Sequence, residues 1–172
     1  MSILKVDTIN EKTTNSGVTI SDLVPNQYQI VQVITVKPTN TTVFSSGSYT
    51  DATGFSVTIT PKYSSSLILL ECWSKAQHNN SGSGNSAQDH RLLRGSTQIY
   101  SARWQNYFNT SWATSDFYPP FTMQYLDSPS TTSATTYKIQ GRLYNGSQLQ
   151  WMINEANGGT QAAVFRATEI KQ

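Results

Sequence analysis

Charged side chains are scarce in this sequence. Aspartate, glutamate, lysine and arginine make up 13% of the 172 residues, against roughly 25% in an ordinary soluble domain. The formal net charge is only +2, and the cations are spread along the chain without a basic run for phosphate neutralisation. This scarcity argues against nucleic acid as a partner. It also disfavours long surface helices, whose exposed faces normally carry Glu, Lys and Arg.

Cysteine and long apolar runs are equally rare. The single cysteine, Cys72, excludes an internal disulfide, and we expect its thiol to be buried as a small apolar group. The longest apolar run, residues 67–70, is far shorter than the ~18 residues of a membrane-spanning helix. Residues 1–5 do not open a secretory signal. We therefore expect no membrane insertion and assembly in a cytoplasm.

Groups suited to catalysis or metal binding are few. The two histidines, His78 and His90, have none of the spacings typical of zinc ligands. No G-x-S-x-G motif is present. The carboxylates that a glycosidase would pair are scattered through the chain, at Asp51, Glu71, Asp89, Asp116, Asp127 and Glu155. We predict no catalytic residues, no metal and no cofactor, and a glycan depolymerase is only a minor alternative.

Two of these carboxylates have structural interpretations. Asp127 precedes Ser128 and Pro129, a sequence typical of a turn in which the aspartate caps the backbone. Glu71 falls on the same strand face as Leu67 and Leu69, so its charge requires a partner such as an arginine or a place at the end of a sheet.

Uncharged polar residues and period-two alternation dominate what is there. Serine, threonine, asparagine and glutamine fill about two fifths of the chain, and most segments alternate as half-buried strands do. Eight to ten strands fit a double-sheet antiparallel sandwich or a jelly roll, so the predicted class is all-β. The predicted strands are 28–36, 55–60, 67–73, 89–94, 98–103, 121–126, 137–144, 149–154 and 162–170.

Three local expectations accompany this assignment. Tyr28, Ile30, Ile34 and Val36 are predicted to share one face of the first strand. The segment 103–112 is the best helix candidate, and its aromatic and Asn/Thr content limits any helix there to a short one. The stretches 78–86 and 128–133 are predicted to be exposed, mobile loops.

Residues 1–24 differ from the rest of the chain. Their few apolar residues are separated by a polar stretch, so the segment cannot form a core of its own. We interpret 1–24 as a docking or trimerisation arm and 25–172 as the sandwich domain. A disordered tail is the alternative for the arm. The expected docking residues are Ile3, Leu4, Val6, Ile9, Val18 and Ile20.

Aromatic residues concentrate between positions 100 and 121, interleaved with amides, an arginine and a carboxylate. Aromatic faces beside planar polar groups are typical of sugar recognition and also of protein interfaces. The same residues could instead be buried between subunits, where Trp and Tyr are enriched. The candidate receptor or glycan contacts are Tyr100, Arg103, Trp104, Tyr107, Trp112, Asp116 and Tyr118.

Several segments resemble virion proteins of marine and cyanobacterial tailed phages, in particular tail-fibre-like proteins. The opening LKVDTI at 4–9 followed by SGVTI at 16–20 resembles their N-terminal segment. The stretches 53–61 with 64–69, 125–129 with 135–140, and 167–170 are similar to the body of the same group. The resemblance thus touches most of the chain, and its motifs are structural rather than catalytic.

The resemblance implies a homotrimer with a jelly-roll head, located in the virion and joined to other virion proteins through its N-terminal arm. The expected function is a short tail-fibre or receptor-binding protein that contacts a host-surface glycan or protein. The chain departs from long fibres because it has no shaft. A tip, a knob or a decoration protein of the capsid or tail therefore stays open as an alternative.

Overall fold

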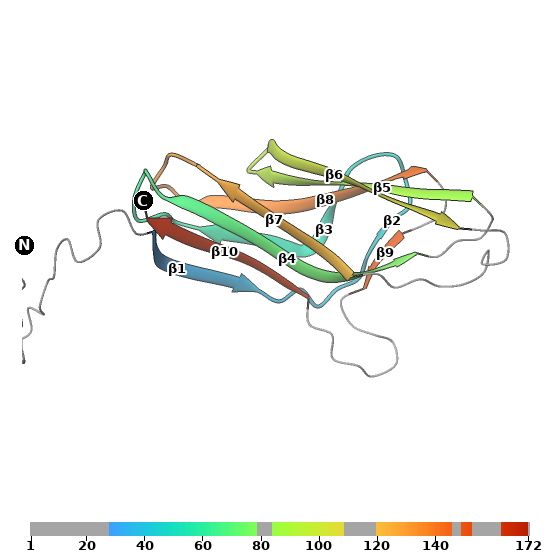
Figure 1. The fold of residues 1–172 in the computed structure, drawn as a ribbon, viewed down its shortest axis with the longest axis horizontal. Helices are drawn as coiled ribbons and strands as arrows, with labels where there is room; N and C mark the ends of the chain where they lie inside the picture. Colours follow the sequence, from blue (N-terminus) through green and yellow to red (C-terminus); the bar gives the residue numbers. More distant parts are fainter. Residues whose placement is uncertain (1–27, 79–83, 109–119, 146–148, 153–162, 172) are drawn as a thin grey trace, which may run out of the picture.

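The computed structural model describes residues 28–78, 84–108, 120–145, 149–152 and 163–171, and all of their regular structure is β (Figure 1). This confirms the predicted all-β class. The strands are β1 (Gln29–Val36), β2 (Thr42–Phe44), β3 (Thr50–Ile59), β4 (Leu67–His78), β5 (Gly84–Arg94), β6 (Thr97–Phe108), β7 (Pro120–Asp127), β8 (Thr135–Asn145), β9 (Leu149–Met152) and β10 (Val164–Lys171).

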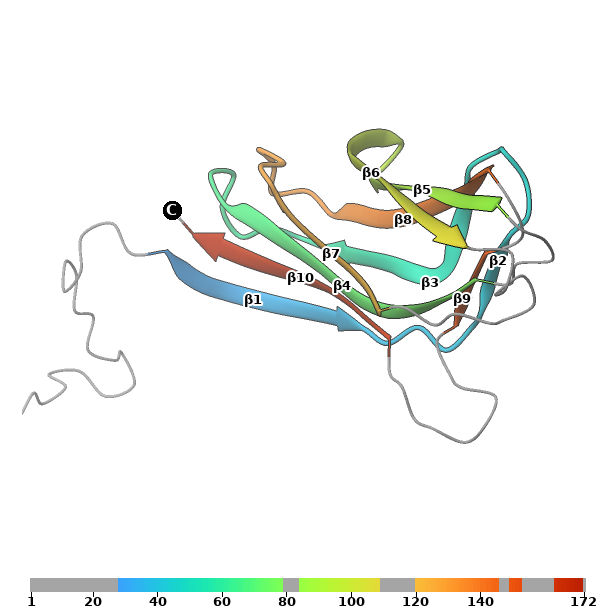
Figure 2. The same ribbon diagram turned by 45° about the vertical axis from the view of Figure 1, so that its right-hand side comes forward.

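The strands form two antiparallel sheets that pack face to face as a sandwich (Figures 1 and 2). In the first, here called sheet A, β4 pairs with β10 on one side and with β7 on the other, and β1 lies outside β10. The short strand β9 pairs with the last residues of β4, Lys75–His78, and β2 pairs with β9. Sheet B has the order β3-β8-β5-β6.

The eight long strands pair in a nested order. β5 pairs with β6, which follows it directly, β4 with β7, β3 with β8, and β1 with β10. The first half of the chain is therefore matched, strand by strand and in reverse, with the second half. Folded across two sheets, this arrangement is a long antiparallel ribbon that has been rolled up.

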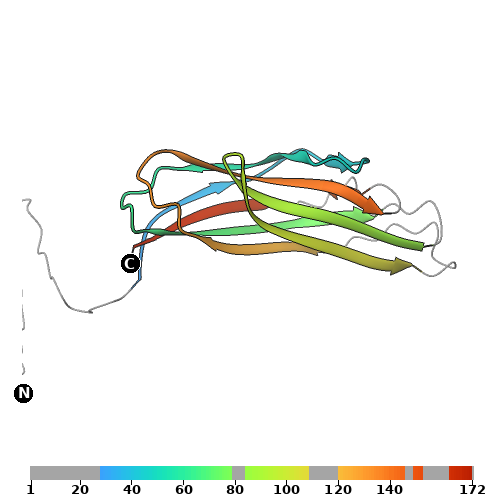
Figure 3. The same cartoon turned by 90° about the horizontal axis from the view of Figure 1, so that it is seen from above.

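Different strands begin and end at the two ends of the sandwich. At what we call the near end, β1 begins and β10 ends, with Gln29 opposite Lys171. At the far end, β4 ends and β5 begins, β6 ends and β7 begins, and β8 ends. Figure 3 shows the strands running lengthwise between these ends. The first described strand, β1, thus begins at the near end.

The core lies between the inner faces of the sheets, where alternate residues of each strand meet. Phe55, Val57 and Ile59 of β3 are almost completely buried, as period-two burial of a half-covered strand requires. Cys72 belongs to the same core, and burial raises the pKa of its thiol well above the usual value. The expectation that this cysteine is a small buried apolar group is confirmed.

Two local predictions are wrong. Ile30 is 70% exposed, because a β-bulge between Ile30 and Gln32 adds a residue and reverses the alternation before Ile34. The segment 103–112, where the sequence allows at most a short helix, is strand through Phe108. The predicted loop 78–86 is shorter, since position 78 ends β4 and positions 84–86 begin β5.

A buried glutamate that the sequence analysis overlooked closes the near end. Glu169 of β10 is fully buried. Its Oε1 accepts bonds from the backbone N–H groups of Lys62 and Tyr63, at 2.7 and 3.2 Å, and from the Ser66 hydroxyl at 2.7 Å. Its Oε2 accepts a 2.6 Å bond from Gln32 Nε2. The carboxylate thereby joins β1 and the β3–β4 turn to β10.

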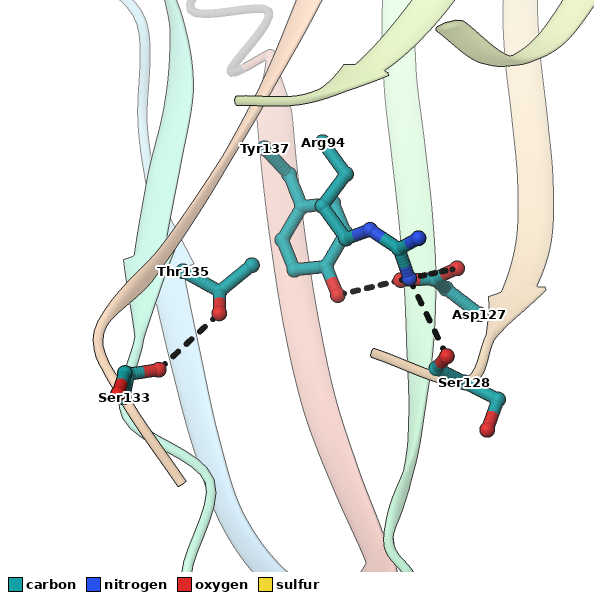
Figure 4. Close-up of polar contacts among 6 residues, drawn as sticks. All are labelled: Arg94, Asp127, Ser128, Ser133, Thr135 and Tyr137. Atoms are coloured by element: carbon teal, nitrogen blue, oxygen red, sulfur yellow. Dashed lines mark hydrogen bonds and ion pairs between the residues drawn. The ribbon is translucent and has the colours of Figure 1, made fainter. Parts of the chain in front are cut away.

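Asp127 is the second carboxylate of the near end, and it bridges the two sheets (Figure 4). It ends β7 in sheet A and accepts a 2.6 Å bond from Tyr137 Oη of β8 in sheet B. Arg94 Nη1, at the end of β5, lies 3.1 Å from both of its oxygens and also donates to Ser128 O. The side chain of Asp127 is therefore used between the sheets, which corrects its assignment to a turn.

Candidate functional site

The outer face of sheet B carries a group of arginine and tyrosine side chains around one carboxylate. The register places Asp89 of β5 directly opposite Arg103 of β6 on one side and Arg142 of β8 on the other. Residues in register on neighbouring strands project to the same face. The arginine–tyrosine cluster, as we call it, consists of Tyr49, Asp89, Arg91, Arg103, Arg142 and Tyr144.

Asp89 is the anchor of this cluster. It is 5% exposed and accepts bonds from Arg103 Nε at 2.7 Å and Nη2 at 3.3 Å. Arg142 adds bonds from Nε at 2.9 Å and Nη2 at 2.7 Å. The bonds from Arg103 and Arg142 outweigh the effect of burial and hold the pKa of Asp89 below its usual value. The carboxylate is therefore an ionised positioning group at neutral pH.

The tyrosine rings hold the guanidinium groups from their other side. The Arg103 guanidinium carbon lies 3.3 Å from the centre of the Tyr144 ring. The ring of Tyr49 has Arg91 at 4.0 Å and Arg142 at 4.6 Å. Such cation–π contacts restrict a long side chain to one orientation. The three arginines are thus ordered before any ligand arrives.

A chain of polar bonds extends the cluster toward β3. Arg91 Nε donates to Gln140 Oε1 at 2.7 Å, and Gln140 Nε2 donates to Asp51. Lys138 Nζ lies 3.0 Å from the same aspartate. Four cations and two carboxylates meet on this face, so two positive charges are in excess there.

The cluster surrounds a shallow hollow with a volume of about 360 Å³. The hollow is lined by Tyr49, Asp89, Ser101, Ala102, Arg103 and Arg142. It contains guanidinium donors, a hydroxyl and an aromatic ring, a combination that binds anions and polar ligands rather than apolar ones.

A second hollow, of about 330 Å³, lies on the outer face of sheet A. Trp73 and Glu71 line it together with Gln124 of β7. Arg166 of β10 lies 3.8 Å from Glu71 and 5.3 Å from the centre of the Trp73 ring. Of the two alternatives predicted for Glu71, an arginine partner or a place at the end of a sheet, the structure has the arginine.

The predicted contact residues divide into three groups. Arg103 belongs to the cluster. Tyr100 is half-buried, and its ring centre lies 5.5 Å from that of Tyr125 across the two sheets, so its environment fits the packing interpretation. Trp104 and Tyr107 belong to β6, but their side chains fall outside the described part. Outside the described residues lie Trp112, Asp116, Tyr118, Glu155 and the docking residues Ile3, Leu4, Val6, Ile9, Val18 and Ile20.

Five residues of the cluster were not predicted as site residues: Tyr49, Asp89, Arg91, Arg142 and Tyr144. Asp89 pairs with Arg103 across the β5–β6 hairpin, so alternation through this hairpin could have identified it. Arg142 reaches Asp89 only through the β5–β8 pairing, which no local pattern reveals.

His90 lies on the opposite face of β5 and points into the core. Its ring centre is 4.7 Å from that of Phe121 and 6.3 Å from that of Phe44. Among the described residues no group of three or more His, Cys, Asp or Glu side chains is arranged to hold a metal ion. That same part of the chain contains no helix long and apolar enough to cross a membrane.

Comparisons with known proteins give only distant likenesses. No protein-family model matches the chain, and no curated protein matches it. The solved structures that are similar include the VP2 subviral particle of infectious bursal disease virus, at 16% identity and a TM-score of 0.37, covering 81% of this chain and 40% of that one. The Gt strain of the same virus gives 14% identity, a TM-score of 0.40 and coverages of 90% and 43%. Dimeric latent PorU of Porphyromonas gingivalis gives 9%, 0.31, 84% and 14%. The chain spans less than half the length of each of these proteins.

Proposed function

We propose that the chain is a virion structural protein of the short tail-fibre type, held on the particle by residues 1–24 and contacting the host surface with its sandwich domain. The observation that carries the proposal is the opposition of the two ends of the sandwich. Gln29 of β1, the strand that follows the arm in sequence, lies at the near end, whereas the aromatic stretch 100–121 includes the end of β6 and the start of β7, both at the far end (Figure 1). A protein anchored at one end and binding at the other requires this separation.

The nested strand pairing supports a jelly roll as the form of this domain. Eight strands paired first to last, in two sheets of a sandwich, are what two Greek keys produce. The resemblance of several sequence motifs to tail-fibre-like phage proteins gives independent support, because it depends on the residues and not on the strand pairing. The hydrogen bonds from Arg103 and Arg142 keep Asp89 ionised. An ionised carboxylate is a poor proton donor, so these bonds support a binding role for Asp89 rather than that of a general acid in hydrolysis.

We expect the chain to be a homotrimer. On the outer face of sheet A, Val33, Leu69 and Leu126 lie in one row across β1, β4 and β7, broken only by Thr168 of β10. Val33 and Leu126 are each 49% exposed, and apolar rows of this kind gain stability when copies cover one another. Native mass measurement at micromolar concentration should give three chains per particle. A monomer at that concentration would contradict the trimer.

Deleting residues 1–24 is expected to abolish incorporation into virions while leaving thermal unfolding of the protein nearly unchanged. The first described strand begins at Gln29, and the bonds of Glu169 that close the near end start at Gln32, so the deletion removes none of these contacts. Virions assembled with each form, purified and probed by immunoblot, give the measurement. A truncated protein that fails to fold would show that the arm belongs to the domain.

The amount of full-length protein in the same virions tests the tail-fibre assignment. A fibre is present as a handful of trimers, whereas a decoration protein follows the copy number of the capsid lattice. Gel densitometry against the major capsid protein separates the two. A capsid-like copy number would replace the tail-fibre assignment by the decoration role.

A further inference from the structure

We propose that the hollow above Asp89 binds the anionic group of an acidic polysaccharide, a sugar carboxylate or sulfate, through Arg103 and Arg142. This inference rests on the proposed contact with the host surface and gives that contact a ligand class. It extends the proposed binding surface from the aromatic stretch 100–121 to the outer face of sheet B.

The arginine geometry leaves a donor edge on each guanidinium. Asp89 engages Nε and Nη2 of both Arg103 and Arg142. Nη1 is not among the atoms that hold the carboxylate. A guanidinium has five N–H donors arranged in a fork, and its second edge suits a planar or tetrahedral oxyanion. Both arginines line the same hollow, so one ligand placed there can contact both side chains.

Charge balance favours an anion in this position. Within the cluster, Arg103 and Arg142 hold a single carboxylate that is almost completely buried, and Arg91 adds a third positive charge beside Tyr49. An incoming carboxylate or sulfate would meet ordered donors, because Tyr49 and Tyr144 already restrict the arginines. Less conformational entropy is then lost on binding than with free side chains.

The surroundings of the hollow favour a sugar as the bearer of the anion. Tyr49 lines the hollow, and Ser101 contributes a hydroxyl to it. Tyr144, which stacks on Arg103, is about half exposed beside them and leaves part of its ring accessible to sugar C–H groups. The chain as a whole has a net charge of only +2, and nucleic acids are bound through many phosphate contacts. One compact anion site with a hydroxyl and an aromatic ring suits an acidic glycan better.

Isothermal titration of the purified full-length protein with three oligosaccharide pools of equal length tests the ligand class. The first pool is hyaluronan fragments, which carry carboxylates. The second is dextran sulfate, and the third is neutral dextran. We expect at least one of the two acidic pools to bind, and which one identifies the anion. Dextran should bind at least tenfold more weakly. Equal binding of dextran would overturn the proposal.

Substitution of Arg103 locates the site. Arg103→Gln should weaken binding of the acidic pool about tenfold or more, because charge-assisted bonds are lost. Arg166→Gln is the matched control: its side chain is 41% exposed against 43% for Arg103, and it lies on the opposite sheet. Arg103→Lys keeps the charge that Asp89 requires but not the forked edge, so it should fold normally and still bind several times more weakly.

Three results would overturn the inference. The first is an equal loss with Arg166→Gln, which would indicate non-specific attraction. The second is undiminished binding by Arg103→Lys. The third is tighter binding of a thymidine oligonucleotide than of either acidic pool, abolished by Arg103→Gln, which would assign the hollow to nucleic acid. Sugar binding and virion incorporation are measured separately. If the purified protein binds no acidic sugar but is present in virions, only this inference is refuted. If it binds acidic sugars but is absent from virions, only the proposed function is refuted.

Discussion

Replacement of Glu169 by alanine is expected to lower the free energy of unfolding by about 3 kcal/mol or more, because it removes the acceptor of four hydrogen bonds at once. The Ser66 hydroxyl is fully buried and would lose its partner. For a domain of this size the loss corresponds to a fall in Tm of roughly 6–12 °C. Urea unfolding monitored by tryptophan fluorescence measures the difference.

Glu71→Ala is the control for this substitution. Glu71 is also a carboxylate of sheet A, but it faces outward and has Arg166 at 3.8 Å as its ionic partner. Its removal should cost less than about 1 kcal/mol, because this ion pair is long and only its arginine side is well exposed. Equal effects of the two substitutions would show that the bonds of Glu169 do not hold the near end together.

The stabilisation by Glu169 should also depend on pH. Burial alone raises the pKa of this carboxyl, but the bonds from Gln32, Ser66 and the two backbone N–H groups outweigh it and place the pKa below the usual value. A lowered folded pKa means stability that is complete above the unfolded pKa of about 4.3 and is lost as the pH falls through the folded value. The stability gap between the native protein and Glu169→Gln should therefore narrow below about pH 4.

Substituting alanine for Gly141 is expected to destabilise the protein by about 1–3 kcal/mol through overpacking. A Cβ at this position of β8 would lie 2.7–3.0 Å from three ring atoms of Phe44. The Phe44 ring is almost completely buried and packs edge-on to His90, so it cannot move aside without disturbing the core. Valine at the same position should be worse than alanine.

Gly47→Ala provides the matched control for Gly141→Ala. A Cβ at Gly47 would meet only the Leu143 carbonyl oxygen, at an ordinary 3.9 Å. We expect a change in unfolding free energy within about 0.5 kcal/mol. If Gly141→Ala is equally neutral, the close packing of Phe44 against β8 does not restrict this position.

Much of the strand content could be predicted from the sequence because alternation is a local signal. Segments such as 67–73 and 137–144 have one face of apolar residues, and both lie within observed strands. The three-residue strand β2 was missed, since three residues are too few to show alternation. The bulge after Ile30 was also missed because the pattern continues unchanged through it.

The candidate site was less predictable because its contacts join distant parts of the chain. Arg142 lies 53 residues from Asp89, and its role depends on β8 pairing with β5. Glu169 did leave a signal: it shares the inward parity of Phe165 and Ala167 on β10. A carboxylate on the apolar face of a strand requires buried donors. This signal could have identified Glu169 as a buried acceptor of hydrogen bonds at the near end.

The nested pairing has a consequence for how the chain folds during synthesis. β10 lies between β1 and β4, and it is translated after the nine other described strands. Among the described strands, β5 and β6 are the one pair of sequence neighbours that bond to each other. Closure should therefore proceed outward, from β4–β7 to β3–β8 and finally β1–β10, each step closing a longer loop. Until Val164–Lys171 emerges from the ribosome, β1 and one side of β4 remain as open edges, so we expect the nascent chain to be most prone to aggregation before β10 is in place.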